Sequence, residues 1–180
     1  MVQPLVYLIT ACVSVNILFI WLLISQRGER KDALSHHGAK SRWTYLVWVI
    51  GHSVGAAAFY LFAQSFFMGI SHYRLIMILV VVGCTCEVIQ ALVPARNNLE
   101  RYHNFFAYTM AWAVLAIGIL ASLFVPQQPW AKLTSTLLMI ALSICPYLAH
   151  ILNKQSLWKV QISSDIIFYT GMFVIYFGRI

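Results

Sequence analysis

The sequence predicts an all-α fold, a polytopic transmembrane bundle of six helices, and three observations support this prediction. Of the 180 residues, 61% are hydrophobic and only 9% are charged, with a mean hydropathy of +0.79. Soluble domains carry about 25% charged residues, so this chain has too few to cover a surface that faces water. Six long apolar runs can each cross a bilayer as a helix. Such uninterrupted runs exclude the short alternating strands of a membrane barrel.

The first three helices are expected at 4–25, 43–67 and 73–93. The first run lacks a basic leader and a small-residue cleavage site, so we expect a retained helix rather than a signal peptide. The second contains Gly51, Gly55 and Ala56, small residues that allow close approach to a neighbouring helix. The third ends at Pro94, because proline disrupts helix hydrogen bonding.

The last three helices are expected at 104–125, 132–152 and 160–178. The fourth follows a polar stretch, the fifth is preceded by Pro126 and Pro129, and the sixth reaches almost to the last residue. Connections are short except for the first, at 26–42. We therefore expect a single transmembrane domain over residues 1–180, with any function located within the bundle or on its surface.

The basic residues predict the orientation of the chain. Lys and Arg favour the cytoplasmic side, and they concentrate in the first, third and fifth connections, so both termini are expected on the non-cytoplasmic side. The net charge of +7 is then an orientation signal that also favours contact with membrane lipids. No basic face is left outside the membrane for nucleic acid. The basic residues on the expected cytoplasmic side are Arg27, Arg30, Lys31, Lys40, Arg42, Arg96, Arg101, Lys154 and Lys159.

Polar and ionisable residues within the predicted helices gather at one depth, toward the cytoplasmic side. Buried ionisable groups are costly in a bilayer, so they mark candidate functional sites. We expect His52, Glu87 and Asp165, from three different helices, to be catalytic. The expected substrate-binding residues at the same depth are Gln90, His103, Asn104, Tyr108, Tyr147, His150 and Tyr169.

Several of these residues also have an ordinary structural interpretation. Asp165 suits the first turn of a helix, His150 suits a last turn, and His103 suits the headgroup boundary. His52 and Glu87 lie deeper, where an unpaired carboxylate must be neutralised or partnered. Their structural alternative is a polar bridge between the second and third helices.

Acid–base chemistry is the leading functional interpretation. In it, the chain is a small membrane enzyme that acts on a lipid or isoprenoid-like apolar substrate entering sideways from the bilayer. His52 and Glu87 form the acid–base pair, and Asp165, His103 or Asn104 orients the substrate. The alternative is a non-enzymatic lipid-binding or transport protein.

Metal or haem binding is a third interpretation, and the spacing predicts no metal or cofactor. Zinc bound by His52, His103, His150 and a carboxylate would draw every ligand from a separate helix, because neither H-x-x-x-H nor H-E-x-x-H occurs. Axial haem ligation by His52 and His103 resembles the six-helix ascorbate-linked b-type cytochromes. The second histidine pair of those proteins has no counterpart here, since His72 and His150 are expected on opposite sides of the membrane.

Two stretches resemble the FRAG/DRAM/SFK group of six-helix membrane proteins and related uncharacterised bacterial families. "LSHHGAKS" (34–41) is similar to that group's Ser-x-x-Gly-Ala loop, and "YHNFFAY" (102–108) resembles its His or His-Asn opening of helix four. The resemblance implies six helices and a lipid-related role, including lipid-anchor remodelling, but no catalytic mechanism. It also implies a first loop that faces away from the cytoplasm, against the orientation that the basic residues predict. The matching residues are Ser35, Gly38, Ala39, His103, Asn104 and Ala107.

Overall fold

The chain folds into six long helices, as the sequence predicts. The computed structural model describes residues 2–25, 41–95, 97–151 and 157–180. Within these ranges the regular structure is helical apart from one isolated bridge between Gln127 and Arg179. The helices are α1 (Val2–Ser25), α3 (Arg42–Phe66), α4 (Tyr73–Leu92), the short 3₁₀ helix η1 (Asn97–Leu99), α5 (Glu100–Phe124), α6 (Pro129–Ile151) and α7 (Leu157–Phe177).

Five of these helices, α1, α3, α4, α5 and α7, are long and apolar enough to cross a membrane. The described apolar part of α6, Pro129–Cys145, is shorter than these five spans. The chain is therefore an integral membrane protein built as a helical bundle. The basic segment 26–40, which contributes much of the orientation signal, lies outside the described residues.

Five helices begin earlier than the hydropathy pattern predicts. The difference is four residues for α5, which begins at Glu100 rather than 104, and three each for α6 and α7, which begin at 129 and 157. It is two residues for α1 and one for α3. Hydropathy marks where apolar side chains begin, whereas a helix continues through polar residues as long as its backbone hydrogen bonds can form. Pro129 suits the first turn of α6, where a missing N–H costs nothing.

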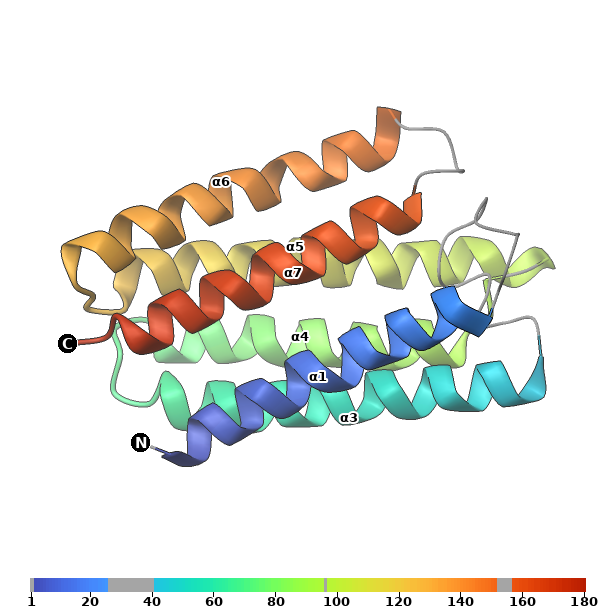
Figure 1. The fold of residues 1–180 in the computed structure, drawn as a ribbon, viewed down its shortest axis with the longest axis horizontal. Coiled ribbons are helices and arrows are strands. Elements are labelled where there is room, and N and C mark those ends of the chain that lie inside the picture. The colour runs from blue at the N-terminus through green and yellow to red at the C-terminus, as the bar shows by residue number, and fades with distance from the viewer. Residues whose placement is uncertain (1, 26–40, 96, 152–156) are drawn as a thin grey trace.

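The helices lie side by side, and each packs on the next along the chain. Additional contacts join α5 to α7 and α1 to α7, so the first and last helices meet. Both termini lie at the same end of the bundle (Figure 1). We call the opposite end, where α1 and α4 finish and α3 and α7 begin, the inner end.

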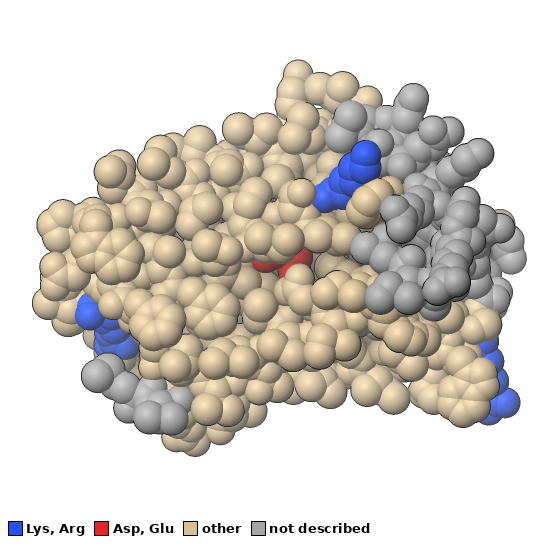
Figure 2. Space-filling view, viewed as in Figure 1, with Lys and Arg blue, Asp and Glu red and all other residues tan. Residues whose placement is uncertain are grey.

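Most of the face that α1 and α7 present is uncharged (Figure 2). A small patch of acidic atoms interrupts it between these two helices, near the middle of the bundle's length. An acidic group at such a position is unusual, because bilayer lipid provides no counterion for it.

The close approach of α1 to α3 depends on glycine, as predicted from the small residues of the second run. A Cβ atom on Gly51 would lie 2.9 Å from Leu18 Cδ2, and one on Gly55 would lie 2.8 Å from Val15 Cγ2. Real Cβ atoms essentially never approach this closely. The missing side chains therefore bring α1 against α3 at the depth where the polar residues of both helices lie.

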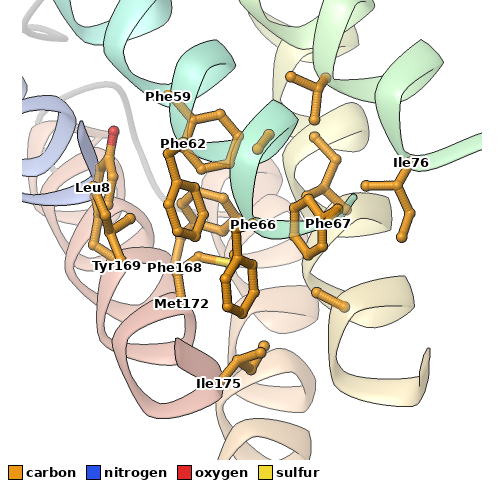
Figure 3. Close-up of a cluster of buried hydrophobic side chains, with 14 of the residues drawn as sticks. Leu8, Phe59, Phe62, Phe66, Phe67, Ile76, Phe168, Tyr169, Met172 and Ile175 are labelled. Carbon is orange, nitrogen blue, oxygen red and sulfur yellow. The ribbon is translucent and has the colours of Figure 1, made fainter. Parts of the chain in front are cut away.

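A cluster of aromatic and aliphatic side chains fills the interior toward the end with the termini (Figure 3). Phe59, Phe62 and Phe66 line one side of α3, and the Phe59 ring lies 5.4 Å from that of Phe168 on α7. The rings of Phe62 and Phe66 stack at 5.1 Å. This packed cluster leaves the inner half of the bundle as the place where polar side chains meet.

Candidate functional site

A histidine and a carboxylate from adjacent helices form the centre of the candidate site. His52 on α3 and Glu87 on α4 meet with Nδ1 and Oε1 3.1 Å apart, a hydrogen bond in which the imidazole N–H donates to the carboxylate. The side chains are 5% and 17% exposed, respectively. A contact this well shielded from solvent is electrostatically stronger than the same contact in water.

The other nitrogen of His52 has no partner. Nε2 is buried and makes no hydrogen bond with any described residue. The imidazole packs against aromatic rings, with its centroid 4.3 Å from that of Trp48 in an edge-on arrangement and 6.2 Å from that of Phe19. Buried polar atoms are nearly always hydrogen-bonded in native proteins, so this nitrogen is an exception that calls for an explanation.

A second polar contact joins α1 to α7. Asn16 Nδ2 donates to Asp165 Oδ2 at 2.8 Å and also to the backbone oxygen of Cys12 at 2.8 Å. Asp165 is partly buried and lies beyond the first turn of α7. The first-turn interpretation of Asp165 is therefore wrong, because α7 begins at Leu157 rather than 160.

The two contacts belong to one cluster. Asp165 interacts electrostatically with Glu87, and Tyr169 interacts with both carboxylates and with the thiols of Cys12 and Cys84. The acidic atoms visible between α1 and α7 in Figure 2 lie at this level of the bundle.

Gly55 provides the space that the cluster requires. A Cβ atom there would lie 3.2 Å from Ser14 Oγ and 3.5 Å from Glu87 Oε1. Counted from the inner ends of their helices at 1.5 Å per residue, Asn16, His52, Glu87 and Asp165 lie about 8–15 Å deep. We call this group, together with Tyr169, the polar cluster.

His103 contacts the backbone at the end of α4. Its Nδ1 lies 2.8 Å from both the Gln90 and Val93 backbone oxygens, and because carbonyl oxygens only accept, Nδ1 carries the proton and donates to both. These carbonyls belong to the C-terminal turn of α4, which lacks intrahelical partners. The buried imidazole of His103 therefore caps the C-terminal end of α4.

Three expected substrate-binding residues face outward. Asn104, Tyr108 and Tyr147 are exposed on the outer surface of the bundle, so the structure does not bring them together with His52. Gln90 is buried on α4, one turn beyond Glu87. His150 lies in the last turn of α6, and its side chain is outside the described residues.

Asn16 is the residue that the sequence interpretation missed. It is the only carboxamide within the central part of the first apolar run, and a polar side chain at that depth is a signal in its own right. Together with Ser14 it brings α1 into the polar cluster. The expected set came from the second to sixth helices and left α1 out.

The described residues do not assemble a metal site. Among them, no group of three or more His, Cys, Asp or Glu side chains lies close enough to hold a metal ion. The Nδ1 atoms of His52 and His103 are engaged with Glu87 and with α4 carbonyls, respectively.

Comparison of this chain with family models, with curated proteins and with solved structures finds no match. A functional assignment therefore depends on the residues of the chain itself.

Proposed function

We propose that this protein is a small membrane enzyme that acts on a lipid or isoprenoid-like apolar substrate by acid–base chemistry. One observation carries the proposal: His52 donates a hydrogen bond from Nδ1 to Glu87, while its Nε2 is buried and has no hydrogen-bond partner among the described residues. A carboxylate that accepts the Nδ1 proton fixes the tautomer of an imidazole. The lone pair is then on Nε2, which is the arrangement of a general base.

In the proposed reaction, Nε2 of His52 removes a proton from the substrate. The imidazolium that forms lies against the Glu87 carboxylate, which stabilises its positive charge, and His52 later returns the proton to the product or to a leaving group. The low-polarity surroundings strengthen this stabilisation. Asp165, held by Asn16, orients the substrate from the side of α7.

The surroundings of His52 favour an apolar substrate. Val15, Leu18, Phe19 and Trp48 belong to one buried apolar cluster beside the imidazole. A hydrocarbon chain is compatible with these residues, whereas a strongly hydrated substrate would lose its water without compensation. Because Nε2 is buried, the substrate gains access when neighbouring side chains rearrange. Membrane lipids are therefore the proposed partners.

The non-enzymatic alternative is supported by the position of the acidic patch between α1 and α7 (Figure 2). A carboxylate that reaches the lipid-facing surface can bind a membrane molecule without transforming it. We also propose that both termini lie on the non-cytoplasmic side, from the distribution of Lys and Arg. The resemblance to the FRAG/DRAM/SFK group agrees with a lipid-related role and remains part of this proposal.

Untargeted mass spectrometry of lipids tests the enzyme proposal. Cells expressing the wild-type chain are compared with cells expressing His52→Gln or Glu87→Gln, and with the matched controls His72→Gln and Glu100→Gln, which change residues outside the polar cluster. We expect the abundance of some lipid species to change in cells that express the wild type or either control. The same species should stay unchanged in cells that express either cluster variant. All variants must retain wild-type helicity and gel-filtration behaviour.

Two results would contradict the enzyme proposal. If His52→Gln alters the lipids as the wild type does, the imidazole is not the base. If the wild type alters no lipid but co-purifies with one, and the cluster variants lose it, the binding alternative replaces the enzyme.

A further inference from the structure

The hydrogen-bond donors around the polar cluster are largely engaged. Asn16 donates to Asp165 and to the backbone of α1. The Ser14 hydroxyl donates to Ala11 O at 3.0 Å, and the Cys84 thiol donates to Ala56 O at 3.3 Å. A ligand that needs donors from the protein therefore finds few, the Tyr169 hydroxyl being the main exception.

The acceptors, in contrast, are largely unused. Glu87 and Asp165 each take part in one side-chain hydrogen bond with the described residues. An ionised carboxylate has about four lone-pair positions, so most of the accepting capacity of both groups is available. His52 Nε2 adds a third buried acceptor without a donor. A ligand that fits this imbalance must bring several donors of its own.

The charges show the same imbalance. The structure describes two carboxylates in the polar cluster and one imidazole, which contacts Glu87. Among the described residues, it places no Lys or Arg within ion-pair distance of Glu87 or Asp165. Lys159, on the same helix as Asp165, is exposed and lies over the Trp158 ring at 5.6 Å. Two like charges in a low-dielectric environment repel strongly unless a cation or a proton compensates them.

We propose that the polar cluster recognises an ammonium group, and that the substrate is an amphiphile with a primary amine attached to a hydrocarbon chain. This inference rests on the proposed function and names its substrate class. An ammonium supplies three N–H donors and one positive charge, so it provides donors for the unused acceptors and offsets the charge of one carboxylate. The acidic atoms between α1 and α7 are visible at the surface (Figure 2), within reach of an amphiphile in the bilayer, and the hydrocarbon chain stays in lipid or against the apolar cluster.

A neutral hydroxyl is the nearest competitor for this site. An alcohol supplies one donor and no charge, so it leaves both carboxylates uncompensated. An anionic headgroup would add a third negative charge. The ammonium is therefore the headgroup class that the residues favour, and comparing headgroups on one constant chain isolates this choice.

Equilibrium binding to the full-length chain in phosphatidylcholine nanodiscs tests the inference, with dodecylamine and dodecanol as probes and empty nanodiscs as background. We expect saturable binding of dodecylamine that Asp165→Asn and Glu87→Gln each weaken about tenfold or more, as expected for loss of a charged hydrogen bond. Glu100→Gln, the same change outside the polar cluster, should leave binding unchanged. Asp165→Asn retains an oxygen that accepts from Asn16, which favours folding of the variant.

Several outcomes would overturn the inference. They are the absence of saturable dodecylamine binding, equal binding by the wild type and both cluster variants, and a dodecanol dependence on the carboxylates equal to that of the amine. None of these alters the lipid comparison of His52→Gln with wild type, which measures the proposed function separately. Amine recognition can therefore fail while acid–base chemistry stands, and the two failures are distinguishable.

Discussion

The hydrogen bond between Asn16 and Asp165 should have a measurable coupling energy, because it joins the first and last helices across 149 positions of sequence. The perturbation is a double-mutant cycle of Asn16→Ala, Asp165→Ala and the double variant. Asn16 also donates to the backbone of Cys12. That bond is lost whether or not Asp165 is present, so it cancels in the cycle.

The magnitude follows from the donor, the acceptor and their surroundings. A hydrogen bond to a charged group contributes about 1.5–3 kcal/mol in soluble proteins. Interhelical polar contacts in a membrane protein average about 0.6 kcal/mol and reach about 1.7 kcal/mol. The Asn16–Asp165 contact is 2.8 Å long and partly buried, which places it in the upper part of the membrane range, at about 1–1.7 kcal/mol.

Reversible unfolding by SDS in mixed micelles, followed by far-ultraviolet circular dichroism, measures the four free energies of unfolding. A second cycle of Asn16→Ala with Tyr147→Ala, an exposed residue on α6, should give additive effects. A coupling energy for Asn16 and Asp165 below about 0.3 kcal/mol, the limit of additivity for independent sites, would refute the contact as a link between α1 and α7.

Three further predictions concern matched pairs or single positions, each measured by the same unfolding experiment. Phe62→Ala should destabilise the bundle by about 3–5 kcal/mol, because it empties a site with 0% exposure. Phe105→Ala, at a residue that is 64% exposed, should have almost no effect, and equal effects would contradict the assigned core. His103→Ala should cost about 1–3 kcal/mol by leaving two α4 carbonyls without a donor, and Asn104→Ala should stay within about 0.5 kcal/mol; an unchanged stability for the histidine variant would refute the cap. Gly55→Leu should destabilise by at least about 1–3 kcal/mol through overpacking against Val15 and Ser14, and wild-type stability would show that α1 and α3 are not in close contact.

The spans could be predicted from the sequence because they follow from a simple physical requirement. A helix in lipid must satisfy its backbone polar groups with hydrogen bonds within the helix, and it needs about 20 apolar residues to span the hydrocarbon core. Run length therefore gives the number and approximate location of the helices. The helix starts were less accurate, because polar residues such as Glu100 and Arg101 continue α5 beyond its apolar part.

The rotation of each helix about its axis could not be predicted in the same way. A helix that is apolar on all sides gives no periodic signal to show which face points inward. Matching depth was enough to group His52 with Glu87, and the structure places these side chains 3.1 Å apart. Depth alone did not distinguish inward from outward positions, and Tyr108 and Tyr147 lie on the outer face.

Local backbone requirements explain the remaining differences. His103 was grouped with the site because of its depth, yet it lies where the chain turns through η1 and meets the end of α4. The unpaired carbonyls of that helix end determine its role. The length of the first run does not reveal the place of Asn16 in the site; the signal is the single amide within that run.

The contact between α1 and α7 has a consequence for how the chain is made. A ribosome delivers α1 to the translocon first and α7 last, so Asn16 enters the bilayer long before Asp165 has been synthesised. An aspartate near the centre of an isolated helix is disfavoured by about 2.5–3.5 kcal/mol during insertion. The Asn16 amide is already in the bilayer when α7 inserts, so it can donate a hydrogen bond to the Asp165 carboxylate. The helix α7 therefore packs against helices that are already in place.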